Sequence, residues 1–358
     1  MEYCVAKLAA AKIWQSDLEM KILIFSSLFA PSIGGMETVM EILAEEFSKA
    51  KHEVRVVTST KKDGSHTKIN YKIVRNPGIV ALFKLICWSD ISIHACVSLK
   101  FAVAALFAGN KMLFIHHTWY ENIEGMSTWK DHLKKYFCRF ATNVSVSQAI
   151  ADRLPVASQV IHNPYRAGIF AIKPEEATKT YDLIAVARLV SDKGIDQLIK
   201  AIASLKGKGV TVSASIVGDG PEKLALENLT RDLEINSNVR FHGLLSADNL
   251  ARIMRQHRML VVPSKWREPF GVVVLEAVAC GLYVIAADGG GIKEALGSCG
   301  LTYPRNDILA LTESLYQLLT TQGAMDVSEN TRQLHLKQFS PTRAAELYLE
   351  SIETILTK

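Results

Sequence analysis

Apolar and polar residues follow two different periods near the start of the chain, and each period predicts one kind of element. The run KILIFSS at 21–27 is short, apolar and rich in β-branched residues, which is typical of a buried strand. In METVMEILAEEFSKA at 36–50 the apolar residues recur every three or four positions, which predicts an amphipathic helix. HEVRVVTS at 52–59 alternates like a second strand. The order strand, helix, strand implies parallel strands joined by helices.

This alternation runs through the first half of the chain and then begins again. Further strand-like runs in the first half are KIVRN, ISIHACV, KMLFIHH and NVSVSQ. After residue 165 the strand-like runs are DLIAVARL, VTVSASIVGDG, VRFHGL, MLVVPS and YVIAAD. The sequence therefore predicts an α/β protein with two doubly wound parallel sheets. The expected division is an extension at 1–19, domains at 20–165 and 166–338, and a terminal helix within 339–358.

Composition agrees with two folded domains and excludes one class of partner. A chain of 358 residues can bury two cores of ordinary size. Hydrophobic residues make up 49% and charged residues 22%, as in compact folded proteins. The 41 Lys and Arg exceed the 36 Asp and Glu by a net charge of only +5. That excess is too small to indicate binding of nucleic acid, so no such partner is expected.

Three negative features of the sequence predict a cytoplasmic location. Charged residues interrupt every apolar run before it reaches the roughly 18–20 residues of a membrane-spanning helix. Residues 1–19 have neither the long apolar centre nor the cleavage site of a signal peptide. The six cysteines are scattered and form no C-x-x-C pair, which suits a reducing compartment.

Candidate chemistry lies where predicted strands end, because open parallel sheets bind ligands at the carboxyl ends of their strands. MLVVPS runs into KWREPFG and then VVVLEAVACG, which places Glu268 in a loop and Glu276 on the following helix. The start of that helix offers unpaired amide donors to an anionic diphosphate. The two carboxylates can accept hydrogen bonds from sugar hydroxyls. Glu residues at such a spacing, taken alone, are more often solvated side chains of a surface turn.

The surrounding residues favour a functional role, since PSKWREPFGVVVLEAVACG resembles the signature of family 4 retaining glycosyltransferases. The resemblance runs from about Lys21 to the carboxyl end. It implies the GT-B fold, in which two Rossmann-like domains face each other across a cleft, and a terminal helix that crosses back to the first domain. By this resemblance Glu268 contacts the donor sugar near the reacting carbon and Glu276 holds the ribose hydroxyls. Phe270 and Gly271 would line the phosphate pocket.

A second motif, VARLVSDKGID, supplies two cations. Arg188 ends a predicted strand, and Lys193 stands just before the next helix. Fixed cations at this place would stabilise the negative charge that develops on a departing diphosphate, and the matching residues of the family have that role. Isolated residues of these types would more often be solvated surface side chains.

Two glycine loops complete the expected donor site. In GGME, which opens the first helix, the resemblance points to Gly35 rather than Gly34 as the residue that approaches the donor diphosphate. In IVGDGP at 216–221, Gly218 and Asp219 would lie beside the donor. A Gly-Gly pair on its own is more often only a turn.

Among the histidines, His116 is the expected catalytic residue. It ends the strand KMLFIHH and matches the family histidine that approaches the transferred sugar. His117 is the alternative at the same place. His94 is interpreted as an acceptor-side or structural residue, and His162 as part of the linker.

The resemblance implies transfer of a hexose from a UDP- or GDP-linked sugar to a glycan or lipid-linked acceptor, with retention of configuration. No D-x-D triplet is present, so neither a metal ion nor a cofactor is expected, and the cations would replace the metal. Two alternatives remain at this stage. One is a nucleotide-sugar epimerase of the same architecture, and the other is a non-catalytic nucleotide-sugar-binding protein.

The acceptor is expected to contact the first domain, where residues 119–140 combine aromatic and basic side chains. A basic, aromatic helix at this place is typical of contact with the inner face of a membrane. An amphipathic helix with an apolar stripe toward the core and a solvated basic face explains the same pattern equally well.

Overall fold

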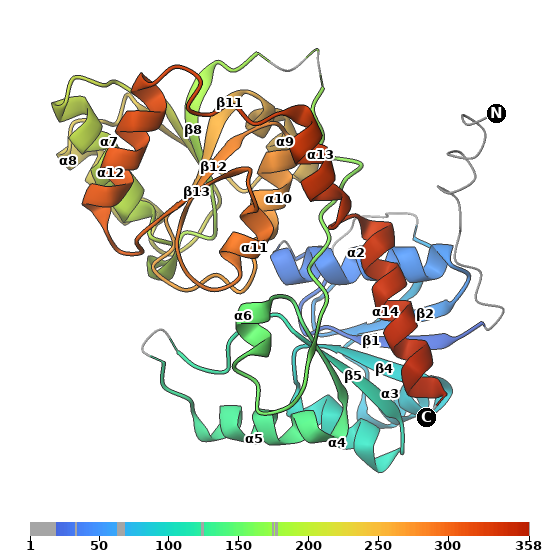
Figure 1. Cartoon of the computed structure of the whole chain (residues 1–358). Helices are drawn as coiled ribbons and strands as arrows, with labels where there is room; N and C mark the ends of the chain where they lie inside the picture. The colour runs from blue at the N-terminus through green and yellow to red at the C-terminus, as the bar shows by residue number, and fades with distance from the viewer. Residues whose placement is uncertain are drawn as a thin grey trace, which may run out of the picture.

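The protein forms two α/β domains, each with helices on both faces of a parallel sheet (Figure 1). The computed structural model describes residues 19–32, 34–62, 69–122, 125–173, 175 and 178–357. The extension expected at 1–19 lies outside these residues except for Glu19. The strand order is β3-β2-β1-β4-β5-β6-β7 in the first sheet and β10-β9-β8-β11-β12-β13 in the second. The predicted fold class is confirmed.

The first domain contains the elements β1 (Lys21–Phe25), α2 (Gly35–Lys49), β2 (Glu53–Thr58), β3 (Lys72–Arg75), α3 (Ile79–Trp88), β4 (Ile91–Ala95), α4 (Leu99–Phe107), β5 (Lys111–His116), α5 (Trp129–Phe137), η1 (Cys138–Phe140), β6 (Thr142–Ser145), α6 (Gln148–Ala151) and β7 (Gln159–Val160). Every strand predicted for this half is present. The short β7 was not predicted.

The second domain contains the elements β8 (Tyr181–Val186), η3 (Ser191–Lys193), α7 (Ile195–Gly207), β9 (Ala214–Val217), α8 (Lys223–Asp232), β10 (Val239–Gly243), α9 (Ala247–Arg255), β11 (His257–Val262), α10 (Val272–Ala279), β12 (Tyr283–Ala287), α11 (Ile292–Leu296), β13 (Gly300–Tyr303), α12 (Ile308–Thr320) and α13 (Glu329–Lys337). The edge strand β13 was not predicted.

Side chains of each strand alternate between two core clusters, as the pleat requires. In β1, Ile22 and Ile24 join a large cluster that includes residues of both domains and of the last helix. Leu23 and Phe25 point to the opposite face, where α3 and α4 pack. A third cluster fills the other face of the second sheet. One continuous apolar core therefore connects the two domains.

The last helix, α14 (Pro341–Leu356), returns to the first domain, where it lies against α2 (Figure 1). The Ser340 side chain accepts from the Arg343 amide and caps its amino end. At its carboxyl end Lys111 Nζ donates to the carbonyls of Ile355 at 2.7 Å and Leu356 at 3.1 Å. The chain thus crosses between the domains twice.

No helix in the described part of the chain is long and apolar enough to cross a membrane.

Candidate active site

A cleft of ≈ 1270 Å³ separates the two domains and is lined by residues of both. It opens at the carboxyl ends of the strands, since its walls include residues that follow β1, β8, β9 and β10. Six of the predicted site residues line it, namely Gly35, Arg188, Lys193, Gly218, Asp219 and Glu276. Ligands of doubly wound sheets bind at such an edge.

Gly35 opens α2 and keeps its side of the cleft clear. A Cβ added at Gly35 would meet no atom within 4 Å, so no neighbour in the protein requires glycine here. At Gly34 the added Cβ would lie 2.3 Å from Glu37 Oε2. That atom is the end of a flexible side chain that can move aside. Gly35 leaves space for a ligand to reach the unpaired amides of the helix start.

Two cations face the cleft from the second domain. Lys193, in η3, donates from Nζ to Glu268 Oε1 at 2.8 Å. Ser264 Oγ donates to the same carboxylate oxygen at 2.5 Å. Arg188 is exposed to the cleft and makes no ion pair within the described residues. From the second domain the cleft thus receives one guanidinium without an ion pair among the described residues and one ammonium that is already paired.

Gly218 brings the second glycine loop onto the end of β8. Its φ is +134°, and an added Cβ would lie 1.9 Å from the Ala187 carbonyl oxygen. The Leu189 amide donates to the Asp219 carbonyl at 2.9 Å, which holds the loop in place. The Asp219 side chain accepts from the Gly220 amide at 2.7 Å. Glycine at 218 is therefore required by backbone packing as well as by any ligand.

The carboxylate of Glu276 projects from α10 to the cleft wall. Burial raises its pKa to about 8, and the nearby Arg166 acts in the opposite direction. Arg166 also pairs with Glu41 of α2 and lines the cleft. At neutral pH the Glu276 carboxyl group therefore holds a proton, so it can donate as well as accept a hydrogen bond.

Phe270 and Gly271 are not among the described residues that line the cleft, so their place in a phosphate pocket stays a prediction. Phe270 is buried, and its ring stacks on His162 with centroids 5.4 Å apart. Gly271 caps α10 with φ +105°, and an added Cβ would lie 2.7 Å from Ile292 Cδ1. Both residues place the helix that carries Glu276, so the geometry gives them a structural role.

The ring of His116 is enclosed in the first domain. Its Nδ1 lies 2.7 Å from Tyr120 Oη and its Nε2 lies 3.0 Å from Asn143 Oδ1. Burial lowers its pKa to about 4. Contact with a sugar would require both hydrogen bonds to break, so its catalytic role stays a prediction without geometric support.

The neighbouring histidines differ in their partners. His117 Nε2 is buried and has no hydrogen-bond partner in the part of the chain that the structure describes. Successive residues of an extended chain point to opposite faces, so His116 and His117 have different surroundings. The letters HH alone do not show this difference. His94 packs between Phe25 and Phe114, which makes it a core residue.

Contacts between the domains hold the loop that carries Glu268, and the sequence did not indicate them. Trp119 Nε1 donates to the Arg267 carbonyl at 2.7 Å. The Arg267 guanidinium pairs with Glu121, which also pairs with Arg153 at 2.9 Å. These residues of the first domain thus contact the residue that precedes Glu268.

The loop at 289–291 contacts Glu268 from the other side. The Gly291 amide donates to the Glu268 carbonyl at 2.9 Å, and a Cβ at Gly290 would lie 2.0 Å from that oxygen. Glu294 then accepts from the Gln148 amide at the start of α6 and lies 2.8 Å from His162. Glu294 and His162 therefore join the domains.

Arg75 is a further cleft residue that the sequence interpretation missed. It ends β3, and its guanidinium donates to the carbonyls of Thr60 and Ala30, both at 2.8 Å. Arg188 was predicted because it is a charged residue at the end of a strand, and the predicted strand KIVRN has the same feature.

Among the described residues, no group of three or more His, Cys, Asp or Glu side chains could hold a metal ion.

Two Rossmann-like domains that face each other across a cleft at their strand ends form the GT-B fold of glycosyltransferases. Residues 169–334 match the family described as Glycosyl transferases group 1. The matched segment covers most of the second domain, which is therefore similar to the group 1 glycosyltransferases.

Individual relatives agree with this family. The phosphatidylinositol N-acetylglucosaminyltransferase gpi3 subunit of Schizosaccharomyces pombe is 27% identical over 348 aligned residues, 87% of this chain and 76% of the relative. A GDP-mannose-dependent alpha-(1-6)-phosphatidylinositol monomannoside mannosyltransferase of Mycolicibacterium smegmatis is 31% identical over 145 residues, 38% of each chain. The crystal structure of Anabaena HepE in complex with UDP-glucose has a TM-score of 0.79 at 20% identity and covers 94% of this chain and 100% of HepE. The family match and the named transferases favour a transferase over the epimerase and the non-catalytic alternative.

Proposed function

We propose that the protein transfers a hexose from a UDP- or GDP-linked sugar to a lipid-linked or glycan acceptor with retention of configuration. The observation that carries the proposal is the convergence of Arg188, Lys193 and Glu276 with the start of α2 on one cleft. Cations and helix amides suit a diphosphate, and a carboxyl group suits sugar hydroxyls. One similar structure is a complex with UDP-glucose, and one relative is named as GDP-mannose-dependent, which supports a nucleotide-sugar donor.

In this proposal Arg188 and Lys193 stabilise the charge that accumulates on the departing diphosphate. The acceptor hydroxyl attacks from the same face, and its proton passes to the departing phosphate, so no protein base is needed. The two cations take the place that a metal ion would have, so the reaction requires neither a metal nor a bound cofactor.

Glu268 is proposed to orient the sugar. Lys193 and Ser264 both bind its Oε1, and Oε2 makes no hydrogen bond within the described residues. The free oxygen can accept from a sugar hydroxyl while the other is held. Glu268 is therefore a binding carboxylate and not one half of a hydrolytic acid and base pair.

The lipid-linked acceptor is supported by relatives of this chain. The names of the fission yeast and mycobacterial proteins both specify phosphatidylinositol-based acceptors. Such an acceptor requires the protein to work at a membrane surface, and a peripheral contact is part of the proposal.

Donor identification and two variants test this function. Thermal unfolding with a panel of UDP- and GDP-sugars should show one donor that raises Tm, because a ligand of the native state stabilises it. Arg188→Ala and Lys193→Ala should each lower the rate of transfer from that donor about 10²-fold or more. Lys208→Ala, a surface lysine of the same domain paired with Glu313, is the control. Undiminished transfer by both cleft variants would contradict the mechanism, and the lack of any stabilising nucleotide sugar would contradict the donor.

A further inference from the structure

Exposed hydrophobic side chains are concentrated on one part of the first domain. Of the sixteen large hydrophobic residues that are exposed in the described chain, nine lie between Ile79 and Phe140. Phe107 is 84% exposed, Ile79 79% and Trp129 70%. The others are Val80, Phe83, Leu106, Met126, Tyr136 and Phe140. Single exposed apolar residues are ordinary, but a cluster marks an interaction surface.

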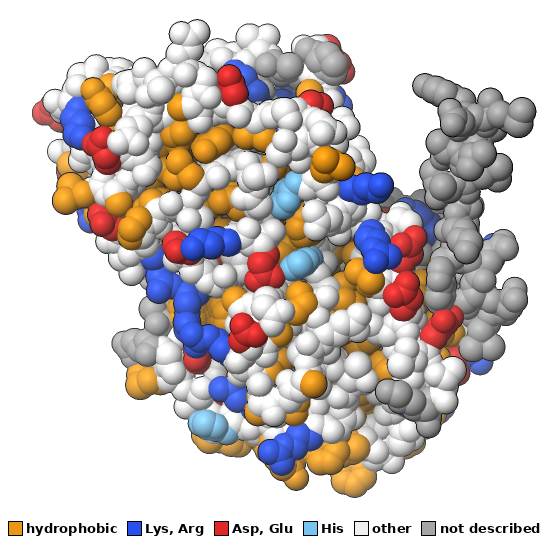
Figure 2. Space-filling model, in the orientation of Figure 1, with side chains coloured by type: hydrophobic (Ala, Val, Ile, Leu, Met, Phe, Trp, Pro, Cys, Tyr) orange, Lys and Arg blue, Asp and Glu red, His pale blue; other side chains and the backbone are white. Residues whose placement is uncertain are grey.

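These residues belong to neighbouring elements, which we call the α3–α5 face: α3, α4, α5 and η1, with Met126 before α5. The contacts α3 to α4 and α4 to α5 make the layer continuous. In Figure 1 α4 and α5 form the lower end of the molecule, and in Figure 2 that end shows hydrophobic side chains beside Lys and Arg. Inward residues of α3 and α4 fill the core, whereas α5 buries no residue. The exposed apolar positions of α3 and α4 are therefore not needed to hold these two helices on the sheet.

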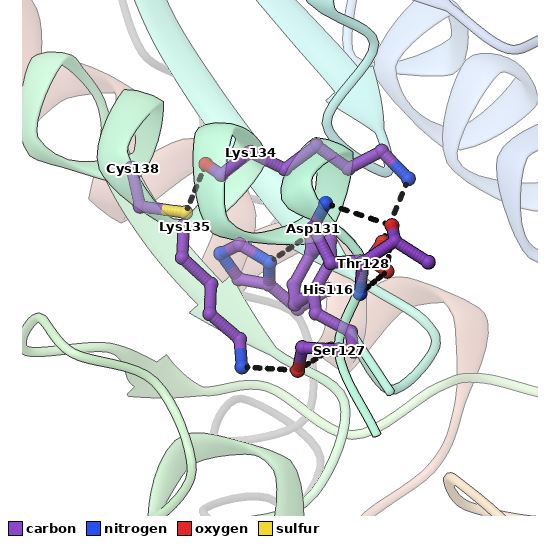
Figure 3. A network of polar contacts seen from close by, with 8 residues as sticks. His116, Ser127, Thr128, Asp131, Lys134, Lys135 and Cys138 are labelled. Atoms are coloured by element: carbon purple, nitrogen blue, oxygen red, sulfur yellow. Dashed lines mark hydrogen bonds and ion pairs between the residues drawn. The ribbon is translucent and has the colours of Figure 1, made fainter. Parts of the chain in front are cut away.

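The charges of the α3–α5 face are almost all positive. Its helices contain six cations, Lys84, Lys100, Lys130, Lys134, Lys135 and Arg139, and a single acid, Asp131. Asp131 is occupied at the start of α5, where it forms a capping box with Thr128 and pairs with Lys134 at 3.3 Å (Figure 3). The ion pair offsets one of the six cations, so these helices keep an excess of five positive charges.

Cations and aromatic rings are interleaved on this surface. Lys130 Nζ lies 5.7 Å from the centroid of the Trp129 ring, and Arg139 Cζ lies 5.6 Å from that of Tyr136. A protein partner is usually met by an apolar centre depleted of lysine. At a bilayer surface, by contrast, aromatic side chains lie at the level of the headgroups and basic side chains lie beside the lipid phosphates.

We infer that the α3–α5 face binds an anionic lipid bilayer, with the exposed rings inserted among the headgroups and the cations against lipid phosphates. This inference rests on the proposed function, because a lipid-linked acceptor gives the contact its purpose. The same stretch of chain leads to the cleft, since Trp119 holds the Arg267 carbonyl next to Glu268. The bilayer partner therefore lies on the acceptor-side domain, and the donor-binding domain stays clear of it.

Vesicle flotation of the full chain tests the face. The protein should float with vesicles of phosphatidylcholine and phosphatidylglycerol and much less with phosphatidylcholine alone. Phe107→Ser with Trp129→Ser, and separately Lys130→Glu with Arg139→Glu, should each lower the bound fraction about tenfold or more. The matched controls are Leu309→Ser, a residue 80% exposed on the second domain, and Lys337→Glu, an exposed lysine on α13. Both controls should float like the wild type.

Three results would overturn the inference. The first is that the wild type does not float with anionic vesicles. The second is that the control variants lose as much vesicle binding as the variants of the face. The third is that the wild type is a dimer which Phe107→Ser with Trp129→Ser converts to a monomer, while flotation does not change. Unchanged Tm of the variants excludes misfolding. The rise in Tm with the nucleotide-sugar donor, measured without lipid, separates the two proposals. If the donor effect is absent while flotation holds, the proposed function fails and the membrane face stands.

Discussion

Glu276 is a carboxyl group whose surroundings hold a proton on it at neutral pH. Burial raises its pKa from 4.5 to about 8, and Arg166 offsets only part of that effect. The neutral carboxyl group can donate one hydrogen bond and accept others, which suits a pair of ribose hydroxyls. A carboxylate at this place would instead add a second anion beside a diphosphate.

The raised pKa of Glu276 predicts a pH-dependent effect of Glu276→Gln on stability. Because the folded pKa lies above the unfolded value, the native state binds the proton more tightly. The stability linked to that proton is complete below pH 4.5 and is lost as pH rises through about 8. Glutamine is neutral at every pH, so the variant does not lose this stability as pH rises. The Tm of the variant should therefore exceed that of the wild type by about 2 °C or more at pH 9 and approach it near pH 5. Thermal unfolding at both pH values measures this, and a difference that does not grow with pH would refute the assignment.

Single residues also show how far sequence motifs can be trusted. Arg188, Lys193 and Glu276 line the cleft, because a strand end or helix start fixes where a nearby side chain lies. Phe270 is not a lining residue of the cleft, because it packs against His162 from another part of the chain. A motif gives the order of residues but not which of them faces inward.

At the scale of elements, the start of α2 offers a test that separates ligand binding from stability. Gly35→Ala adds a methyl group where the protein has no atom within 4 Å and where the first helical turn tolerates alanine. The free energy of unfolding should stay the same or rise by about 0.4–1 kcal/mol. The methyl group would enter the space of the donor diphosphate, so the rise in Tm with donor should be largely lost. Gly207→Ala, also without a close neighbour, is the control at the end of α7. Normal donor binding by Gly35→Ala would exclude this glycine from the site.

The elements themselves were predictable where the pattern was local. Strands such as β1 and β5 are continuous apolar runs, since parallel sheets are covered on both faces. The edge strand β13 has mostly half-buried residues, and β7 has only two residues, so neither leaves such a run. Among the described residues of the aromatic and basic stretch 119–140, the helix begins at Trp129, where Thr128 provides the cap. Before that cap, contacts with the second domain fix Trp119 and Glu121, and no local pattern encodes them.

At the scale of the whole molecule, α14 fastens the end of the chain to the first domain through Tyr348. This side chain is fully buried, and its hydroxyl has no hydrogen-bond partner within the described residues. Tyr348→Ala should lower the free energy of unfolding by about 3–5 kcal/mol, because it leaves a large cavity. Tyr348→Phe keeps the ring and removes an unpaired polar group, so it should be neutral or stabilising. Denaturant titration of both variants measures these free energies of unfolding. An equal loss in both variants would show that the Tyr348 hydroxyl makes a hydrogen bond.

The loop that carries Glu268 is held against the first domain by several contacts, and the hydrogen bond of Trp119 is one of them. Its indole N–H is bound to the Arg267 carbonyl at 2.7 Å, while the Arg267 and Arg153 guanidinium groups lie 5.2 Å and 5.5 Å from its ring. Trp119→Phe keeps an aromatic ring between those cations and removes the hydrogen bond. Such a bond contributes about 0.5–1.5 kcal/mol, so kcat for transfer should fall by roughly 2- to 10-fold. The KM for the donor should change little, because Arg188, Lys193 and Glu276 do not touch Trp119.

The control is Trp88→Phe, at a first-domain tryptophan covered by Arg55, which should leave both constants unchanged. A rise in donor KM without a change in kcat would show that Trp119 supports donor binding and not the placement of Glu268.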